Sequence, residues 1–384
     1  MRILQVTNII SHHQLPLARC LAASIGAGNF RFAITQPPNS QRQELGWKSD
    51  ESDSWILRVG INKADRIEFE RWWDEADVVL CGDRLFDRMK IRLNNRRLTF
   101  HMSERWWKPP IGLARLLHPR FALMTVRFRQ LAKSSFFHFL AIGEYSAADI
   151  MRITNFQGKI WRWAYFTSIP DPLPAYNRKE QGFRVLWAGR MLRWKRVDTL
   201  IKSFSRLLVE RPDATLTLVG EGPERRQLEH LAEKMLSREC YRFLPSMPAT
   251  EVPKLMRQCH VYVLPSNAYE GWGAVVNEAM AEGCTVIASE ATGAAKTMIR
   301  HGVNGLLFAP GDWRRLGDLL CQVSSDDTLR NRLADQGQCT IVELWSPKVA
   351  AKRFLSVTSA LLAGQSIPVF DEGPMVITPK GRIE

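Results

Sequence analysis

Short apolar runs rich in β-branched residues alternate with amphipathic stretches along the whole chain. In the first half, this pattern predicts strands at 2–7, 30–35, 77–81, 98–101, 136–142 and 159–165. Apolar residues at helical spacing predict helices at 15–25 and 64–75, and a third that begins at Glu144. The polar stretch 36–54 is expected to be a loop.

The second half repeats the alternation, with strands predicted at 183–188, 214–219, 241–244, 261–264 and 285–288. Pro170, Pro172 and Pro174 lie between the halves and exclude a helix there, so we place a domain boundary at this point. A chain of 384 residues is long enough for two domains. Because strands and helices alternate in both halves, we expect an α/β protein. Its parts are a first domain at 1–172, a second parallel domain at 176–345, a helix at 347–362 and a loosely held tail at 365–384.

The stretch 260–285 organises the second half. Its buried strand, 261–264, is closed by Pro265, and a turn bracketed by Gly271 and Gly273 leads into a helix at 274–281. A helix that starts beside a glycine turn presents backbone N–H groups and the positive end of its dipole. The sequence therefore predicts a phosphate site at this turn.

Two carboxylates flank the same helix start: Glu270 precedes it and Glu278 lies within it. Carboxylates accept hydrogen bonds from paired hydroxyls, so a diphosphate with a sugar on each side, a nucleotide sugar, fits the arrangement. The alternative is an exposed loop glutamate and a solvated helix glutamate. The apolar neighbours of Glu278 weigh against that alternative.

Two cations follow the predicted strand 183–188. Arg190 can present a fork of donors and Lys195 a point charge, so together they can neutralise a diphosphate. A solvated basic loop is the alternative.

The stretch 265–283, Pro-Ser-Asn-Ala-Tyr-Glu-Gly-Trp-Gly-Ala-Val-Val-Asn-Glu-Ala-Met-Ala-Glu-Gly, resembles the donor-site signature of the family-four retaining glycosyltransferases, also called group 1. The resemblance is close over about 183–320 and looser in the first half. It implies the GT-B fold, two Rossmann-like domains facing across a cleft, with the helix 347–362 crossing back to the first domain. It also implies transfer with retention of configuration.

The resemblance also implies roles for particular residues. Arg190 and Lys195 would bind the diphosphate, Glu278 the ribose and Glu270 the sugar. The donor turn would comprise Gly271, Trp272 and Gly273. The backbone of Arg242 and Phe243 would lie near the nucleobase, although Pro245 stands where the family often has glycine.

His101 is the first-domain residue that the resemblance places opposite the donor sugar. Its position at the predicted end of strand 98–101 suits this role, and a structural histidine is the alternative. Glu104 and Arg105 follow on the same rim. They are expected to pair with each other, or Glu104 to act as acid or base toward an acceptor hydroxyl.

The loop 8–14 follows the first strand, at the sheet edge where open α/β sheets bind ligands. It has no glycine, which excludes a dinucleotide fingerprint and departs from the glycine pair usual in the family. His12 and His13 are candidate acceptor-side donors here, or members of a polar surface loop.

The net charge of the chain is +14, and most of it comes from residues 84–133. This segment contains thirteen lysines and arginines and only two acidic residues, which gives it a net charge of +11. Such a block indicates an anionic partner: a membrane surface, an acidic glycolipid or nucleic acid. Residues 111–133 read as an amphipathic helix with a basic face, kinked or split at Pro119. Beside Trp106 and Trp107, such a helix is typical of binding to anionic lipid.

Seven scattered cysteines without pairing or metal spacing suit a reducing cytoplasm. The first residues enter a strand directly, so no signal peptide is expected, and no apolar stretch is long enough to span a membrane. The absence of an Asp-x-Asp run predicts no bound metal, and no cofactor is expected. We expect a cytoplasmic protein, or one peripheral on the inner face of the membrane.

The sequence thus predicts a glycosyltransferase that moves a sugar from a nucleotide diphosphate to a hydroxyl of a glycan or membrane glycolipid. One alternative is a catalytically silent GT-B-like binding protein, which the missing glycines near His12 allow. A basic nucleic-acid-binding protein is the other, and it leaves the glutamate pair unexplained; we expect no nucleic acid partner.

Overall fold

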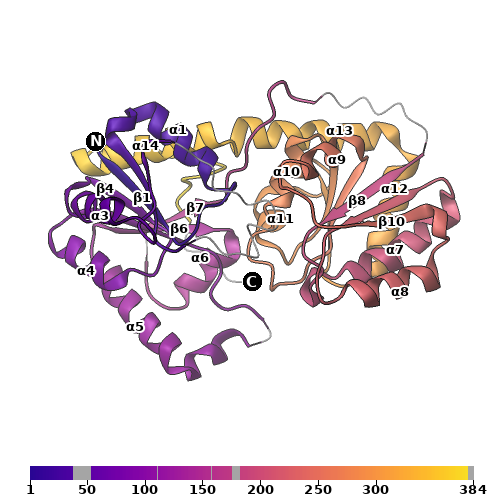
Figure 1. Ribbon diagram of the computed structural model, residues 1–384, viewed down its shortest axis with the longest axis horizontal. Helices are drawn as coiled ribbons and strands as arrows, with labels where there is room; N and C mark the ends of the chain where they lie inside the picture. Colours follow the sequence, from indigo (N-terminus) through magenta and orange to yellow (C-terminus); the bar gives the residue numbers. More distant parts are fainter. Residues whose placement is uncertain (38–52, 110, 157, 175–181, 379–384) are drawn as a thin grey trace. The chain divides into compact units, whose positions relative to one another are not determined.

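The computed structural model describes residues 1–37, 53–109, 111–156, 158–174 and 182–378. These residues form two compact units (Figure 1). One comprises Met1–Thr167 with Trp345–Glu384, and the other Ser168–Leu344. Most of the predicted loop 36–54 lies outside the described residues.

A parallel sheet forms the centre of the first unit. Its described strands are β1 (Ile3–Thr7), β2 (Phe30–Ile34), β3 (Ile56–Leu57), β4 (Val78–Cys81), β5 (Leu98–Ser103), β6 (Phe137–Ile142) and β7 (Ile160–Trp163). They follow the order β3-β2-β1-β4-β5-β6-β7, every pairing parallel. Every residue of β1, β4 and β6 is buried, as expected for strands covered on both faces.

Helices cover this sheet. They are α1 (Leu15–Ile25), α3 (Lys63–Glu75), α4 (Phe86–Asn94), α5 (Pro119–Ala132), α6 (Glu144–Met151) and α14 (Pro347–Ala363), with 3-10 turns at Ala27–Asn29 and Gly112–Leu117. The helix predicted at 111–133 is split at Pro119, which starts α5 because proline suits the first helical turn. Strand β3 and helix α4 were not predicted: β3 has two residues, and α4 lies in the basic block.

The C-terminal segment belongs to the first unit. Helix α14 lies alongside α1 (Figure 1), and the ring of Phe354 lies 5.1 Å from that of Phe100. After α14, the backbone N–H of Arg162 donates to the carbonyl of Val376 at 2.8 Å, and Met375 is buried. The expectation of a loose tail is therefore wrong as far as residue 378, because the chain pairs with β7 there. Residues 379–384 lie outside the described residues.

The second unit is built on its own parallel sheet. The strands are β8 (Arg184–Ala188), β9 (Thr215–Val219), β10 (Tyr241–Leu244), β11 (Val261–Leu264), β12 (Thr285–Ser289) and β13 (Leu306–Phe308). Their order is β10-β9-β8-β11-β12-β13, again with parallel pairing throughout. With the first sheet, this confirms the predicted pair of Rossmann-like α/β domains.

The helices of the second unit are α7 (Val197–Glu210), α8 (Arg225–Met235), α9 (Val252–Gln258), α10 (Val275–Ala281), α11 (Gly293–Met298), α12 (Trp313–Ser325) and α13 (Asp327–Cys339). Short turns of 3-10 helix occur at Arg193–Lys195 and Arg238–Cys240, and a π-helical turn at Thr340–Leu344. Leu200, Phe204 and Leu316 are among the fully buried residues of the core.

Within the parts of the chain described above, no helix combines the length and apolar character needed to cross a bilayer. The seven cysteines carry free thiols.

Candidate functional site

The strand order of the second sheet reverses between β8 and β11. From β8 the chain proceeds through β9 to β10, and then returns to place β11 on the other side of β8. In open α/β sheets, ligands bind beyond the carboxyl ends of the strands at such a switch point. The loops at this position are 189–196, after β8, and 265–274, after β11, and they carry the predicted donor residues.

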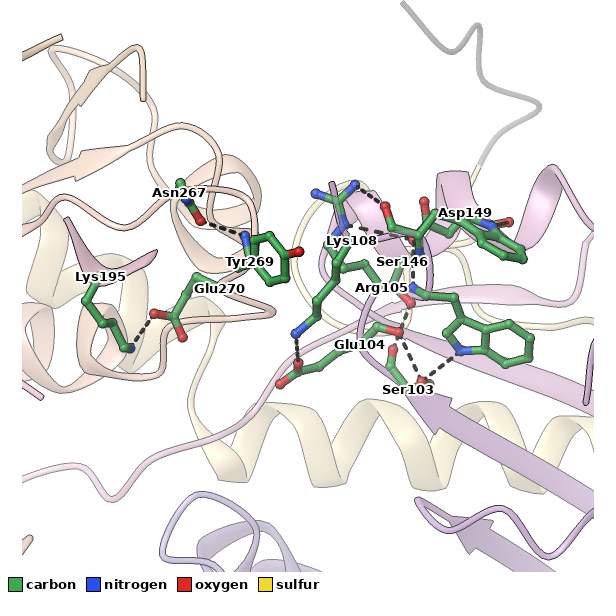
Figure 2. Close-up of polar contacts among 12 residues, drawn as sticks. Ser103, Glu104, Arg105, Lys108, Ser146, Asp149, Lys195, Asn267, Tyr269 and Glu270 are labelled. Carbon is green, nitrogen blue, oxygen red and sulfur yellow. Dashed lines mark hydrogen bonds and ion pairs between the residues drawn. The ribbon is translucent and has the colours of Figure 1, made fainter. Parts of the chain in front are cut away.

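Lys195 and Glu270 meet between these two loops (Figure 2). The ammonium group forms a short ion pair with the carboxylate, which also accepts a hydrogen bond from the Ser266 hydroxyl at 3.1 Å. The backbone N–H of Asn267 donates to the carbonyl of Trp194 at 2.9 Å, which ties one loop to the other. The structure thus brings one predicted cation and one predicted acid to a single place.

Tyr262, for which the sequence indicated no role beyond that of a strand residue, lies on β11 opposite Leu186 of β8, the two strands that lead into these loops. Its buried hydroxyl donates to the carbonyl of Ala188 at 3.0 Å, so it joins β11 to the end of β8. Burial raises the pKa of the Tyr262 phenol, and the negative charges of Glu278 and Glu270 raise it further. A tyrosine in an apolar strand gives no sequence signal for this role.

Two glycines allow the turn after β11 to pack closely. A Cβ on Gly293 would lie 2.4 Å from the carbonyl oxygen of Gly271, so the start of α11 supports the turn only because residue 293 has no side chain. Gly273 has a φ of +92°, which other residues rarely adopt. The start of α11 at Gly293 therefore packs directly against the predicted glycine turn.

The loop after β8 rests on a second glycine turn. A Cβ on Gly220 would lie 1.9 Å from the carbonyl oxygen of Gly189, and one on Gly222 would lie 2.4 Å from that of Met191. Arg190 lies between Gly189 and Met191, and its side chain is exposed. The structure places it on the same loop as Lys195.

Trp272 supports the donor turn from inside. Its ring is buried, and the indole N–H donates to the side-chain oxygen of Asn277 at 3.0 Å. Glu278 is half-buried in the first turn of α10. Helix α10 has only seven residues, so its dipole is small. An anion at the turn would therefore be neutralised mainly by the cations of the loop 189–196.

Arg242 and Phe243 lie on β10, an edge strand of the second sheet. The Arg242 guanidinium donates to the Thr217 hydroxyl at 2.9 Å, and Phe243 lies under Arg225, at 5.7 Å from its guanidinium carbon. Their proximity to a nucleobase stays a prediction.

The first sheet also has a switch point, between β1 and β4. The predicted acceptor-side loop follows β1, and the rings of His12 and His13 lie 3.7 Å apart in it. The Thr7 hydroxyl lies 3.0 Å from the side-chain oxygen of Gln14, and the His13 carbonyl accepts the backbone N–H of Phe166 at 3.1 Å. The loop is thus held by β1 and by the chain after β7.

The placement of His101 at a strand end was wrong. Strand β5 continues to Ser103, so His101 is an interior residue, 2% exposed, and its Nδ1 lies 3.0 Å from the carbonyl oxygen of Cys81. The rings of Phe86, Phe128 and Phe139 surround it. Burial lowers the pKa of His101 to about 4, which keeps the ring neutral at physiological pH. It is a core histidine.

The rim of the first sheet begins at Ser103, and its ion pairs differ from the expected Glu104–Arg105 pair. Glu104 pairs with Lys108 at 3.5 Å, and the Arg105 guanidinium lies 3.9 Å from the Asp149 carboxylate (Figure 2). Glu104, Arg105 and Lys108 lie in an irregular segment after β5, so no helix or strand periodicity predicts which of them pair.

Asp149 organises this rim, although the sequence analysis gave it no role. One carboxylate oxygen accepts the backbone N–H groups of Trp106 at 2.7 Å and Trp107 at 2.8 Å (Figure 2). The Ser146 hydroxyl donates to the carbonyl of Ser103 at 2.7 Å. Burial raises the pKa of Asp149, and the two N–H groups and Arg105 act in the opposite direction. The only feature of the sequence that pointed to Asp149 is that it follows Ser146, Ala147 and Ala148 in the helix that begins at Glu144.

Residues 172–339 match the model of the family described as glycosyl transferases group 1. Two relatives illustrate the similarity. An uncharacterized glycosyltransferase of Methanocaldococcus jannaschii, MJ1607, is 31% identical over 45% of this chain and 44% of its own length. The lipopolysaccharide core biosynthesis glycosyltransferase LpsE of Rhizobium meliloti is 30% identical over 46% of this chain and 49% of its own length. The alignments therefore span less than half of these relatives.

A solved structure resembles nearly the whole chain. Anabaena Alr3699/HepE, solved in complex with UDP, is 18% identical, with a TM-score of 0.70 over 94% of this chain and 100% of its own. At this identity the likeness shows the fold alone, the pair of Rossmann-like units of the GT-B fold. The match to the glycosyl transferases group 1 family thus falls within the second unit, the one that carries Lys195 and Glu270.

Proposed function

We propose that the chain transfers a sugar from a nucleotide diphosphate sugar to an acceptor hydroxyl, with retention of configuration. The observation that carries the proposal is the meeting of Lys195 and Glu270 at the switch point of the second sheet, inside the segment that matches the family. HepE was solved with UDP, which agrees with a nucleotide ligand.

Lys195 and Arg190 would neutralise the diphosphate. Glu270 forms an ion pair with the Lys195 ammonium, and a bound diphosphate, with more negative charge, would compete for that ammonium. Glu270 would then be released to accept hydroxyls of the sugar, and Glu278 would accept those of the ribose.

In the transfer step, the bond from the anomeric carbon to the diphosphate oxygen breaks, and its electron pair stays on that oxygen. The acceptor oxygen forms the new bond, and its proton passes to the departing diphosphate or to solvent. Cations fixed beside the diphosphate stabilise the charge that develops there. No metal is expected in this role.

The acceptor would be a glycan or glycolipid, bound by the first unit near the loop of His12 and His13 and the rim of Glu104. LpsE, a relative, is named for lipopolysaccharide core biosynthesis, which agrees with an acceptor of this class.

The test measures release of nucleotide from a panel of nucleotide sugars, with and without glycan acceptors. We expect Lys195→Ala and Glu270→Ala to lower turnover by about a hundredfold or more. Matched controls are Lys254→Ala and Glu251→Ala, which remove an exposed Lys–Glu pair in the same unit and should leave turnover unchanged. Normal turnover in either site variant would refute the assignment.

The burial of His101 favours one alternative, a protein that binds nucleotide sugars without transferring them, because the histidine expected opposite the sugar lies in the core. Under this alternative, UDP would raise the melting temperature and no donor would be consumed.

A further inference from the structure

An apolar groove of about 870 Å³ lies in the first unit, between the start of α4, the 3-10 turn Gly112–Leu117 and α5. Phe86, Phe121 and Met124 line it, and Phe86 and Met124 are buried. Ile111, Leu117 and Leu123 line it as well, with side chains that remain largely in water. The groove thus has both buried and exposed apolar walls.

The exposed apolar side chains are concentrated at this place. Six of the eighteen exposed large apolar residues in the described parts of the chain fall within 111–126: Ile111, Leu113, Leu116, Leu117, Leu123 and Val126. Leu117 is 86% exposed. Three of the six, Ile111, Leu117 and Leu123, line the groove itself. Single exposed leucines are ordinary, whereas several exposed apolar side chains at one groove mark an interaction surface.

Positive charge surrounds the same groove. Arg84, Arg115, Arg120 and Arg127 line it. Arg115 is anchored there, since its guanidinium donates to the carbonyl of Trp106 at 3.0 Å. Arg127 pairs with the exposed Asp87 at 3.2 Å.

Some other residues of the basic segment 84–133 are buried and do not belong to this surface. Arg92 is buried and donates to the carbonyl of Ala76 at 2.8 Å, so it adds little to the surface charge. Trp106 and Trp107 are also buried, so the expectation that they lie on a lipid-binding surface was wrong. The leucines of the groove occupy the exposed position instead.

We propose that the groove is a membrane-docking surface that takes acyl chains of anionic phospholipids, with their phosphates on the arginines. A phospholipid offers an apolar chain beside a negative charge, which complements an apolar groove edged by guanidinium groups. An extended acidic peptide would satisfy the arginines and leave Leu117 and Leu123 in water. The proposal concerns the first unit alone and holds whether or not the chain transfers a sugar.

Cosedimentation of the full chain with vesicles tests the proposal. We expect binding to vesicles of phosphatidylcholine with phosphatidylglycerol and much weaker binding to phosphatidylcholine alone. Raising the salt from about 0.1 M to about 1 M shortens the screening length from about 10 Å to about 3 Å, so binding should weaken. Some binding should persist, because the apolar contacts are not screened.

Two variants separate the apolar from the charged contribution. Leu117→Glu with Leu123→Glu should lower vesicle affinity by about tenfold or more at both salt concentrations. Arg120→Gln with Arg127→Gln should lower it by about fivefold per arginine at low salt and by less at high salt. Matched controls on the second unit are Val209→Glu, at a side chain that is 82% exposed, and Arg332→Gln.

The proposal is overturned if the wild-type chain stays in the supernatant with anionic vesicles, or if the leucine variant sediments as the wild type does. It is also overturned if polyglutamate, and not the vesicles, binds through the same residues. The shift in melting temperature caused by UDP reports on the second unit in the same samples. Its loss would count against the proposed function and leave the docking surface standing.

Discussion

Lys195 and Glu270 form an ion pair across seventy-five positions of the chain. Their loops follow neighbouring strands, β8 and β11, so the parallel pairing of those strands brings the two residues together. The side chains are only 18% and 15% exposed, which makes each charge costly to leave without this partner.

A double-mutant cycle measures how strongly the pair is coupled. Lys195→Ala and Glu270→Ala should each lower the free energy of unfolding. Their two losses should add up to more than the loss in the double variant, and the difference, the coupling energy, should be about 0.5–3 kcal/mol. Urea unfolding provides the measurement. The same cycle on exposed Lys254 and Glu251 should give about 0–1 kcal/mol. Equal coupling in both cycles would show that the site pair is an ordinary surface contact.

Gly293→Ala should disturb the donor turn. The new Cβ would lie 2.4 Å from the Gly271 carbonyl oxygen and 3.3 Å from the Trp272 Cα, and backbone atoms have little freedom to yield. We expect a loss of about 1–3 kcal/mol in the free energy of unfolding and weaker binding of UDP, measured by thermal unfolding and by titration.

Gly28→Ala is the control for this variant, because no atom lies within 4 Å of a Cβ at that position. If Gly293→Ala bound UDP and unfolded as the control does, the close packing beneath the turn would be unimportant.

Acid should destabilise the first unit through His101. The pKa of His101 is lowered to about 4 by burial, below the ordinary value of about 6.5, so the unfolded state takes up a proton first. The stability contributed by the neutral ring is therefore full above about pH 6.5 and is lost as the pH falls toward 4. At 1.36 kcal/mol per unit, the loss is about 3 kcal/mol.

Chemical unfolding at a series of pH values checks this expectation. His101→Asn, which keeps a donor for the Cys81 carbonyl and cannot titrate, should flatten the curve between pH 6.5 and 4. His230→Asn on the exposed side of α8 should leave it unchanged. An identical slope in His101→Asn and the wild type would show that other groups cause the acid sensitivity.

Asp149→Asn should loosen the rim after β5. The carboxylate accepts two backbone N–H groups and faces Arg105, and hydrogen bonds to a charged group contribute about 1.5–3 kcal/mol. We expect a loss of that size in unfolding free energy and a change in the near-ultraviolet signal of Trp106 and Trp107. Asp318→Asn, at an exposed ion pair, should change neither.

Much of the fold could be predicted from the sequence because each strand is a local apolar run. Runs such as 261–264 and 137–142 are buried on both faces, so apolar residues predominate in them and the pattern is easy to recognise. The glycine turn and the glutamates of the donor loop were also local, since they lie within one motif of about twenty residues. Among the elements of the first unit that were not predicted, β3 is a very short strand and α4 is a helix with many charges.

The sequence by itself determined that the chain alternates strands and helices, and that Lys195 and Glu270 stand in loops at strand ends. Only the tertiary structure decided that they meet, that the Tyr262 hydroxyl bonds to the end of β8, and that His101 faces a cluster of phenylalanines. Periodicity along a chain reports which residues are buried. Contacts between distant residues depend on strand order, register and the last residue of each strand, which are set by packing across the whole sheet.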